Sequence, residues 1–119
     1  GFGGALREPT GLDGLADRLR SITGREPQVF EGGPATVERV AIVTGGGAKL
    51  VREAASAGYD AYITGEPAEP TLPLARELGI HFLAGGHYAT ETFGIKALAE
   101  KLAAEFSLDW EFVDVPVPV

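Results

Sequence analysis

His87 and Glu91 are the two residues of this sequence best placed to do chemistry together. They lie four positions apart in Gly85-Gly86-His87-Tyr88-Ala89-Thr90-Glu91-Thr92. Residues with this spacing lie on one face of a helix, about one turn apart, so an imidazole and a carboxylate can converge on one point. These are ligand types that suit zinc, manganese and iron. The alternative is an exposed polar pair on a surface helix, which is the commoner meaning of this spacing alone.

The segment before this pair favours the metal interpretation. Ile80 to Ala84 is predicted to be a short apolar strand, and two glycines then let the backbone turn sharply before a helical pattern that begins near Thr90. In open α/β folds, ligands collect at the carboxyl ends of strands. Because the sequence has no cysteine, any metal here must be held by His, Asp, Glu or water.

Two further side chains belong to predicted strand ends. Glu66 follows a strand that ends at Thr64, and we expect it at the same edge of the sheet as His87. There it could act as a general base, orient His87, or simply flank a helix, which is the commonest role of such a carboxylate. His81 lies in the apolar strand, and we interpret it as a structural or half-exposed histidine and not as a ligand.

Three consecutive glycines, Gly45-Gly46-Gly47, join a predicted strand to a predicted helix. Bare backbone at such a junction can bind an anion through its N–H groups. However, no Walker lysine and no Gly-x-Gly-x-x-Gly fingerprint accompanies the glycines. We favour a tight turn that lets strand and helix pack closely, and keep an anion- or nucleotide-binding module as the weaker alternative.

The spacing of apolar residues predicts strands that alternate with helices. The predicted strands cover residues 28–30, 37–43, 61–64, 80–84 and 110–115, and the predicted helices cover 11–23, 50–57, 71–78 and 90–106. This order predicts an α/β fold in which residues 1–119 form a single domain, with a largely parallel sheet and helices on both faces. The tail from residue 115 to 119 is predicted to be extended.

Composition and charge narrow the possible partners. The chain has 119 residues and a net charge of −7, and its ten Lys and Arg residues are scattered among 17 acidic ones. This argues against binding to a nucleic-acid backbone, which needs clustered positive charge. No membrane-spanning run or signal peptide is visible, so we expect a cytoplasmic protein that binds small molecules or other proteins. The absence of Met predicts a processed chain or a fragment.

Three segments together resemble the C-terminal half of the Nif-three-like dinuclear metal centre proteins, which are often labelled GTP cyclohydrolase type-two homologues. The segments are Val40-Ala41-Ile42-Val43-Thr44-Gly45-Gly46-Gly47, Asp60-Ala61-Tyr62-Ile63-Thr64-Gly65-Glu66, and residues 84–98 around His87 and Glu91. The similarity covers about residues 12–118. Its most specific part is Gly-His-x-x-Thr-Glu, occurring after Thr-Gly-Glu.

The resemblance implies a fold of two related halves, a ring-shaped hexamer, and two divalent metal ions (zinc, manganese or iron) in each subunit. The C-terminal half of the family supplies one His and one Glu as metal ligands, which correspond to His87 and Glu91. The N-terminal half supplies a histidine-rich motif and an acidic ligand, and this chain lacks that half.

We therefore expect a metal-binding domain that contributes His87 and Glu91 to the dinuclear centre of a metal-dependent hydrolase. Glu66 would orient a ligand or act as the base, and the missing N-terminal half or another chain would complete the site. The alternative is a non-catalytic assembly or regulatory domain that keeps the fold and uses its apolar faces for oligomer contacts.

Overall fold

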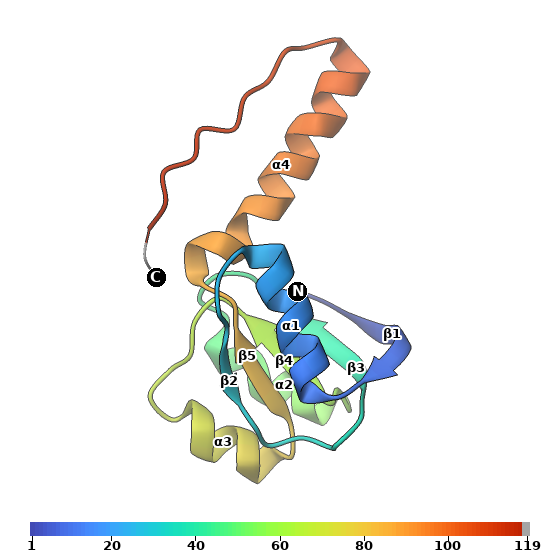
Figure 1. Cartoon of the computed structure of the whole chain (residues 1–119), viewed down its shortest axis with the longest axis vertical. Helices are drawn as coiled ribbons and strands as arrows, with labels where there is room; N and C mark the ends of the chain where they lie inside the picture. The colour runs from blue at the N-terminus through green and yellow to red at the C-terminus, as the bar shows by residue number, and fades with distance from the viewer. Residues whose placement is uncertain (118–119) are drawn as a thin grey trace.

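The centre of the molecule is a five-stranded sheet (Figure 1). Its strands lie in the order β1-β3-β4-β5-β2. They are β1 (Phe2–Thr10), β2 (Gln28–Phe30), β3 (Val37–Ile42), β4 (Ala61–Thr64) and β5 (His81–Ala84). The helices are α1 (Leu12–Thr23), α2 (Val51–Ser56), α3 (Thr71–Leu78) and α4 (His87–Phe106), and a short 3-10 turn, η1 (Ala48–Leu50), precedes α2. This computed structural model describes residues 1–117, and the last two residues of the predicted tail lie outside it.

The sheet is mixed. β3, β4 and β5 pair in parallel, as the alternation of strands and helices predicts. β1 and β2 pair antiparallel at the two edges, with β3 and β5 respectively. The sequence pattern does not predict β1, because most of its side chains are exposed and its apolar residues do not alternate with polar ones. The α/β prediction is confirmed, with a parallel centre and antiparallel edges.

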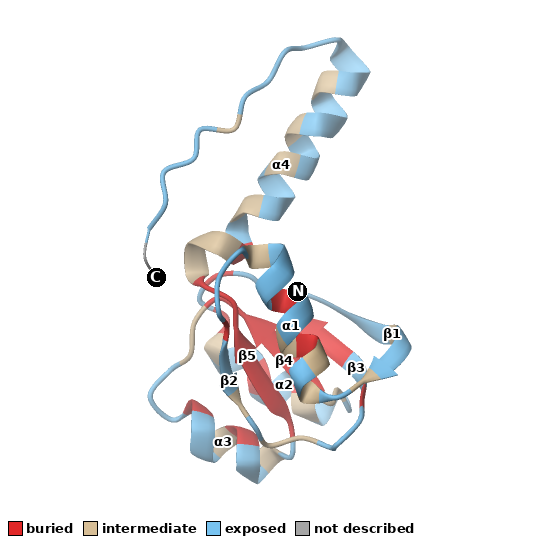
Figure 2. Ribbon diagram, viewed as in Figure 1, coloured by how far each residue is buried: buried red, intermediate tan, exposed pale blue. Residues whose placement is uncertain are grey.

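Helices cover both faces of the sheet, as predicted (Figure 2). On one face, Leu15 and Leu19 of α1 pack with Val40, Ile63 and Leu83 of the strands. The other face is covered by α2 and α3, whose buried residues cluster with aromatic and aliphatic side chains of β4 and β5: Val51, Ala54, Ala75, Tyr62 and Phe82. Figure 2 shows the buried residues concentrated in the central strands.

Helix α4 begins at His87, three residues before the predicted start near Thr90. Gly86 precedes it with φ 98°, a conformation that favours glycine, and this lets the chain turn from β5 directly into the helix. After its first turns α4 projects away from the sheet (Figure 1), and Thr90 is its only buried residue. Within the described residues, no helix is long and apolar enough to cross a membrane.

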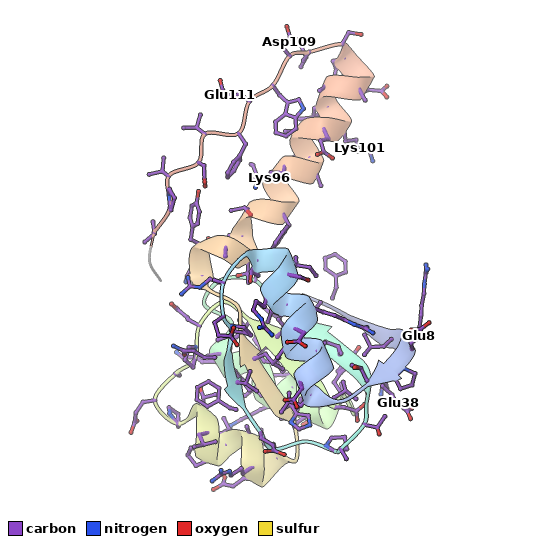
Figure 3. All side chains as sticks on the ribbon, in the orientation of Figure 1. Glu8, Glu38, Lys96, Lys101, Asp109 and Glu111 are labelled. Atoms are coloured by element: carbon purple, nitrogen blue, oxygen red, sulfur yellow. The ribbon has the colours of Figure 1, made fainter. Side chains whose placement is uncertain are left out.

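The strand predicted for residues 110–115 is wrong. This segment forms no strand; it runs back along α4, and the side chains of the two segments meet between them (Figure 3). The Tyr88 hydroxyl donates a 2.6 Å hydrogen bond to Asp114, and Lys96 Nζ lies 4.2 Å from the centre of the Phe112 ring. Because α4 carries the chain away from the sheet, whose edges β1 and β2 already occupy, this segment has no strand to pair with.

His81 is a structural histidine, in agreement with the interpretation of the sequence. It is 2% exposed at the start of β5. Its Nδ1 accepts a hydrogen bond of 3.2 Å from the Gly33 N–H, so Nε2 carries the proton and donates to the Pro34 carbonyl at 2.8 Å. The imidazole thus anchors the loop between β2 and β3.

We predict that His81→Phe lowers the free energy of unfolding, although the ring volume is kept. The partly buried Gly33 N–H and the carbonyl of the exposed Pro34 would lose their partner. We expect a loss of about 1 kcal/mol, because water can replace part of these hydrogen bonds. Urea unfolding of both proteins measures the difference. An unchanged free energy of unfolding would show that water can replace the imidazole.

Candidate metal centre

Three strand-to-helix junctions meet at the carboxyl ends of the parallel strands. Gly45 follows β3, Gly65 follows β4, and Gly86 follows β5. The Gly65 N–H donates to the Gly45 carbonyl at 2.9 Å, and the Gly86 N–H donates to the Gly65 carbonyl at 2.8 Å. These backbone hydrogen bonds continue the sheet pairing beyond the strands and fix the three junctions relative to one another.

The predicted residues come together here, with His87 between two carboxylates. His87 Nδ1 lies 3.2 Å from Glu66 Oε2, and His87 Nε2 lies 3.3 Å from Glu91 Oε1. The side chains are half-exposed, at 36% for His87, 45% for Glu66 and 54% for Glu91. The site is therefore an open one that a ligand can reach. The expectation that Glu66 shares a sheet edge with His87 agrees with this geometry.

This arrangement calls for a cation. A neutral imidazole has one N–H and one lone pair, so it can donate to only one of the two carboxylates. Its other nitrogen then presents a lone pair to an ionised oxygen, which is repulsive. Either a second proton or a metal ion, bound between the imidazole nitrogen and the carboxylate, removes this repulsion. The residues present thus suit a metal ion chemically.

The glycines make room for these side chains. A Cβ atom on Gly46 would lie 3.3 Å from Glu66 Oε1, and one on Gly65 would lie 2.7 Å from the Cα of His87. A Cβ on Gly45 would collide with the Glu91 carboxylate, and Gly45 also has φ 66°. The triple glycine therefore serves close packing, the interpretation that the sequence favoured.

Two buried threonines, which the sequence reasoning did not select, hold the loop of Gly45, Gly46 and Gly47 in place. We call this segment the glycine loop. Thr90 Oγ1 accepts a hydrogen bond from the Gly45 N–H at 3.1 Å, and Thr64 Oγ1 accepts one from the Gly47 N–H at 3.2 Å. Two of the three N–H groups of the loop are thus used inside the protein, which weakens the anion-binding alternative. The threonines could have been noticed because they lie within the Thr-Gly-Glu and His-x-x-Thr-Glu segments.

The three site residues do not form a complete metal cage. Because the two ring nitrogens of His87 point to different carboxylates, Glu66 and Glu91 cannot meet the same atom of the ring. Among residues 1–117, no group of three or more acidic or histidine side chains is arranged to hold a metal ion. His81 lies at the opposite end of β5 and takes no part in the site.

The chain belongs to the Duf34/NIF3 (NGG1p interacting factor 3) family, whose model matches residues 1–117. It is 45% identical over 117 residues to the GTP cyclohydrolase 1 type 2 homolog of Haemophilus influenzae, covering 97% of this chain and 46% of that protein. The corresponding homolog of Escherichia coli is 47% identical, with 97% and 47% covered. This chain therefore spans about half the length of these curated relatives.

Solved structures agree with this family assignment and with the share of the relatives that the chain spans. A structural genomics structure of "protein ybgI, unknown function" is 45% identical and superposes with a TM-score of 0.92, over 98% of this chain and 48% of that one. The crystal structure of TTHA1606 from Thermus thermophilus is 40% identical, with a TM-score of 0.87 and coverages of 95% and 45%. The resemblance noted in the sequence is thereby confirmed.

Tyr62 stabilises the glycine loop through a hydrogen bond. Its ring is buried, and its hydroxyl donates a 2.6 Å hydrogen bond to the Gly47 carbonyl. Burial raises the pKa of Tyr62 above its ordinary value, because the phenolate would be poorly solvated; Glu53 adds to this effect, and a hydrogen bond with Thr64 opposes it.

We predict that alkaline pH destabilises the fold partly through Tyr62. Since the pKa is raised in the folded state, the contribution of Tyr62 to stability is complete below the unfolded-state pKa of about 10 and is lost as pH rises through the folded-state value. Tyr62→Phe should be less stable than the parent at pH 8 but should lose less stability up to pH 11. Urea unfolding at several pH values measures this, with Tyr59→Phe as the control. Parallel pH profiles for the parent and Tyr62→Phe would contradict the prediction.

Proposed function

We propose that this chain contributes one half of the metal centre of a metal-dependent hydrolase. His87 Nε2 and the Glu91 carboxylate are the ligands, and Glu66 orients the imidazole. The observation that carries the proposal is the position of His87 between two carboxylates, which a neutral imidazole alone cannot satisfy. Further ligands would come from the part of the full-length relatives that this chain does not contain.

The roles of Glu91 as a ligand and of Glu66 as an orienting partner are assigned from their distances to the imidazole of His87. Two ligand atoms that each lie about 2.0–2.1 Å from a tetrahedral zinc ion are about 3.3 Å apart, and His87 Nε2 lies 3.3 Å from Glu91 Oε1. On the other side, the separation of 3.2 Å between Nδ1 and Glu66 suits an N–H that donates to a carboxylate. Metal-binding histidines commonly donate their second N–H to such a carboxylate, which fixes the tautomer and the ring orientation.

A bound divalent metal ion would supply an activated water and polarise the bond to be hydrolysed. The residues of this chain prepare the site for it. Glu66 accepts a hydrogen bond from the Nδ1–H of His87, which leaves the Nε2 lone pair free. The helix holds Glu91 one turn away, and the glycine loop brings backbone close without filling the space. Thr64 and Thr90 keep that loop in position.

We predict that the 119-residue chain binds zinc or manganese weakly, because two protein ligands do not hold these ions tightly without others. His87→Ala and Glu91→Ala should abolish this binding, and Glu66→Gln should weaken it by about 10–100-fold, as expected for a partner that orients a ligand. Isothermal titration calorimetry in chelator-treated buffer measures the affinities.

Glu100→Ala is the matched control, since it removes an exposed carboxylate from the same helix outside the site. It should leave metal affinity unchanged. Because the site residues are half-exposed, all four variants should stay within about 0.5 kcal/mol of the parent in unfolding free energy. If His87→Ala retains the parent's affinity, the metal is bound elsewhere and the proposal fails.

We propose as a second function that α4 takes part in assembly with another copy of the chain. Four apolar residues, Ile95, Leu98, Leu102 and Phe106, recur at intervals of three and four along α4 and therefore form one stripe. Leu102, the least exposed of them, is still 43% exposed. A stripe of this kind facing water is typical of a helix that packs against another surface.

We predict that the chain self-associates at high micromolar concentration and that Leu102→Lys shifts it to the monomer. A charge in the centre of an apolar contact would have to be buried without a partner. Sedimentation velocity measures the change, and Glu100→Lys, at an already charged position of α4, is the control. A monomeric parent at every concentration would rule out this mode of assembly for the chain alone.

A further inference from the structure

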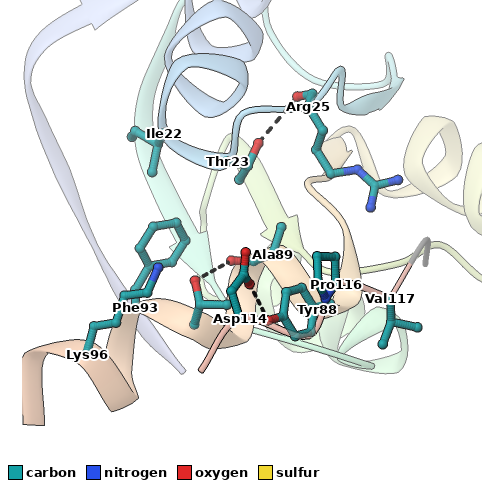
Figure 4. Close-up of a pocket in the computed structure, with 11 residues that line it drawn as sticks. Ile22, Thr23, Arg25, Tyr88, Ala89, Phe93, Lys96, Asp114, Pro116 and Val117 are labelled. Carbon is teal, nitrogen blue, oxygen red and sulfur yellow. Dashed lines mark hydrogen bonds between the residues drawn. The ribbon is translucent and has the colours of Figure 1, made fainter. Parts of the chain in front are cut away.

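Arg25 lies beside the candidate metal centre and has no role in the function proposed above. It follows α1, and the Thr23 hydroxyl donates a 3.3 Å hydrogen bond to its carbonyl, which fixes the turn (Figure 4). Its side chain packs against Gly86. A Cβ atom on Gly86 would lie 2.6 Å from Arg25 Nη1 and 2.8 Å from Cδ. The guanidinium of Arg25, an exposed residue, therefore lies close to the backbone of the residue that precedes His87.

A cavity of about 280 Å³ opens between Arg25 and Glu66. Glu26, Gln28, Gly65, Pro67, Ala84 and Gly86 also line it. The Glu26 carboxylate is engaged by Arg20, whose Nε lies 3.3 Å from it. Glu66 is shared between this cavity and His87, so the cavity borders directly on the candidate metal centre. Its size is at the lower end of the range of about 300–1,000 Å³ that is typical of small-molecule sites, so it has room for one charged group of a larger ligand.

The charge of Arg25 is free to act on a ligand. Within residues 1–117, Arg25 forms no ion pair. The neighbouring carboxylate, Glu26, pairs with Arg20 Nε at 3.3 Å, and Glu66 pairs with His87. Arg25 is thus a cation without a carboxylate partner, in a chain whose net charge is −7.

We propose that Arg25, assisted by the Gln28 amide, forms an oxyanion subsite that binds a phosphate or carboxylate group of the substrate. Both groups accept the paired N–H donors of a guanidinium, whose planar fork matches their geometry. An anion held in this cavity would lie beside Glu66, which also faces His87. The assignment of the anion to a substrate rests on the proposed function, whereas binding of the anion does not.

The test is titration of the full 119-residue chain with inorganic phosphate, and separately with acetate, in metal-free buffer. The amide signals of Gly86 and His87 in nitrogen-15 NMR spectra report on the cavity. We expect saturable shifts at these residues. Arg25→Gln should weaken binding by about tenfold or more, since it removes a charged hydrogen-bonding partner. Arg25→Lys keeps the charge but lacks the planar pair of N–H donors. Its affinity for the anion should therefore lie between those of the parent and of Arg25→Gln.

Arg76→Gln, in the exposed part of α3, is the matched control and should bind like the parent. Tighter binding of phosphate than of acetate would assign a phosphorylated substrate, and the reverse would assign a carboxylate; either result supports the subsite. Absence of shifts at Gly86, or equal affinity in Arg25→Gln, would overturn it. Metal affinity should be unchanged in Arg25→Gln, so loss of the anion site and failure of the metal proposal are separate results.

Discussion

The candidate site is built around one imidazole that faces two carboxylates. Either carboxylate alone would form an ordinary hydrogen bond with His87, but together they leave one ring nitrogen facing negative charge. The surrounding residues fit this arrangement. Parallel strands bring Glu66 and His87 to one edge, the first turn of α4 carries Glu91, and glycines leave space for all three side chains. A larger residue at Gly45 would displace the Glu91 side chain, and one at Gly65 would displace the backbone of His87.

Much of the fold could be predicted from local patterns, because buried parallel strands are short continuous apolar runs and α1 and α3 end at glycines. Ala61–Thr64 and Thr71–Leu78 have the predicted bounds. β1 and the segment at 110–115 could not be predicted in the same way. Pairing of β1 depends on the exposed edge of β3, and the apolar residues near Trp110 look like a strand although α4 holds them away from the sheet.

The candidate site was predictable to the extent that its residues are close in sequence or follow the ends of parallel strands. The spacing of His87 and Glu91 is local, and Glu66 follows from the topology. The position of Arg25 beside the site could not be predicted in this way, because Arg25 lies far along the chain from His87. Only the packing of its side chain on Gly86 brings Arg25 close to His87. The roles of Thr64 and Thr90 likewise depend on tertiary hydrogen bonds to the glycine loop.

The outer strand β1 has a consequence for how copies of this protein can meet. It is an edge strand of nine residues, and an exposed edge of that length offers a template on which another strand could pair. However, its register with β3 is interrupted between Ala5 and Thr10, and Pro9 in that stretch has no N–H to donate. An incoming strand would find a broken ladder. Growth of the sheet from one molecule into the next is therefore disfavoured along this part of the edge.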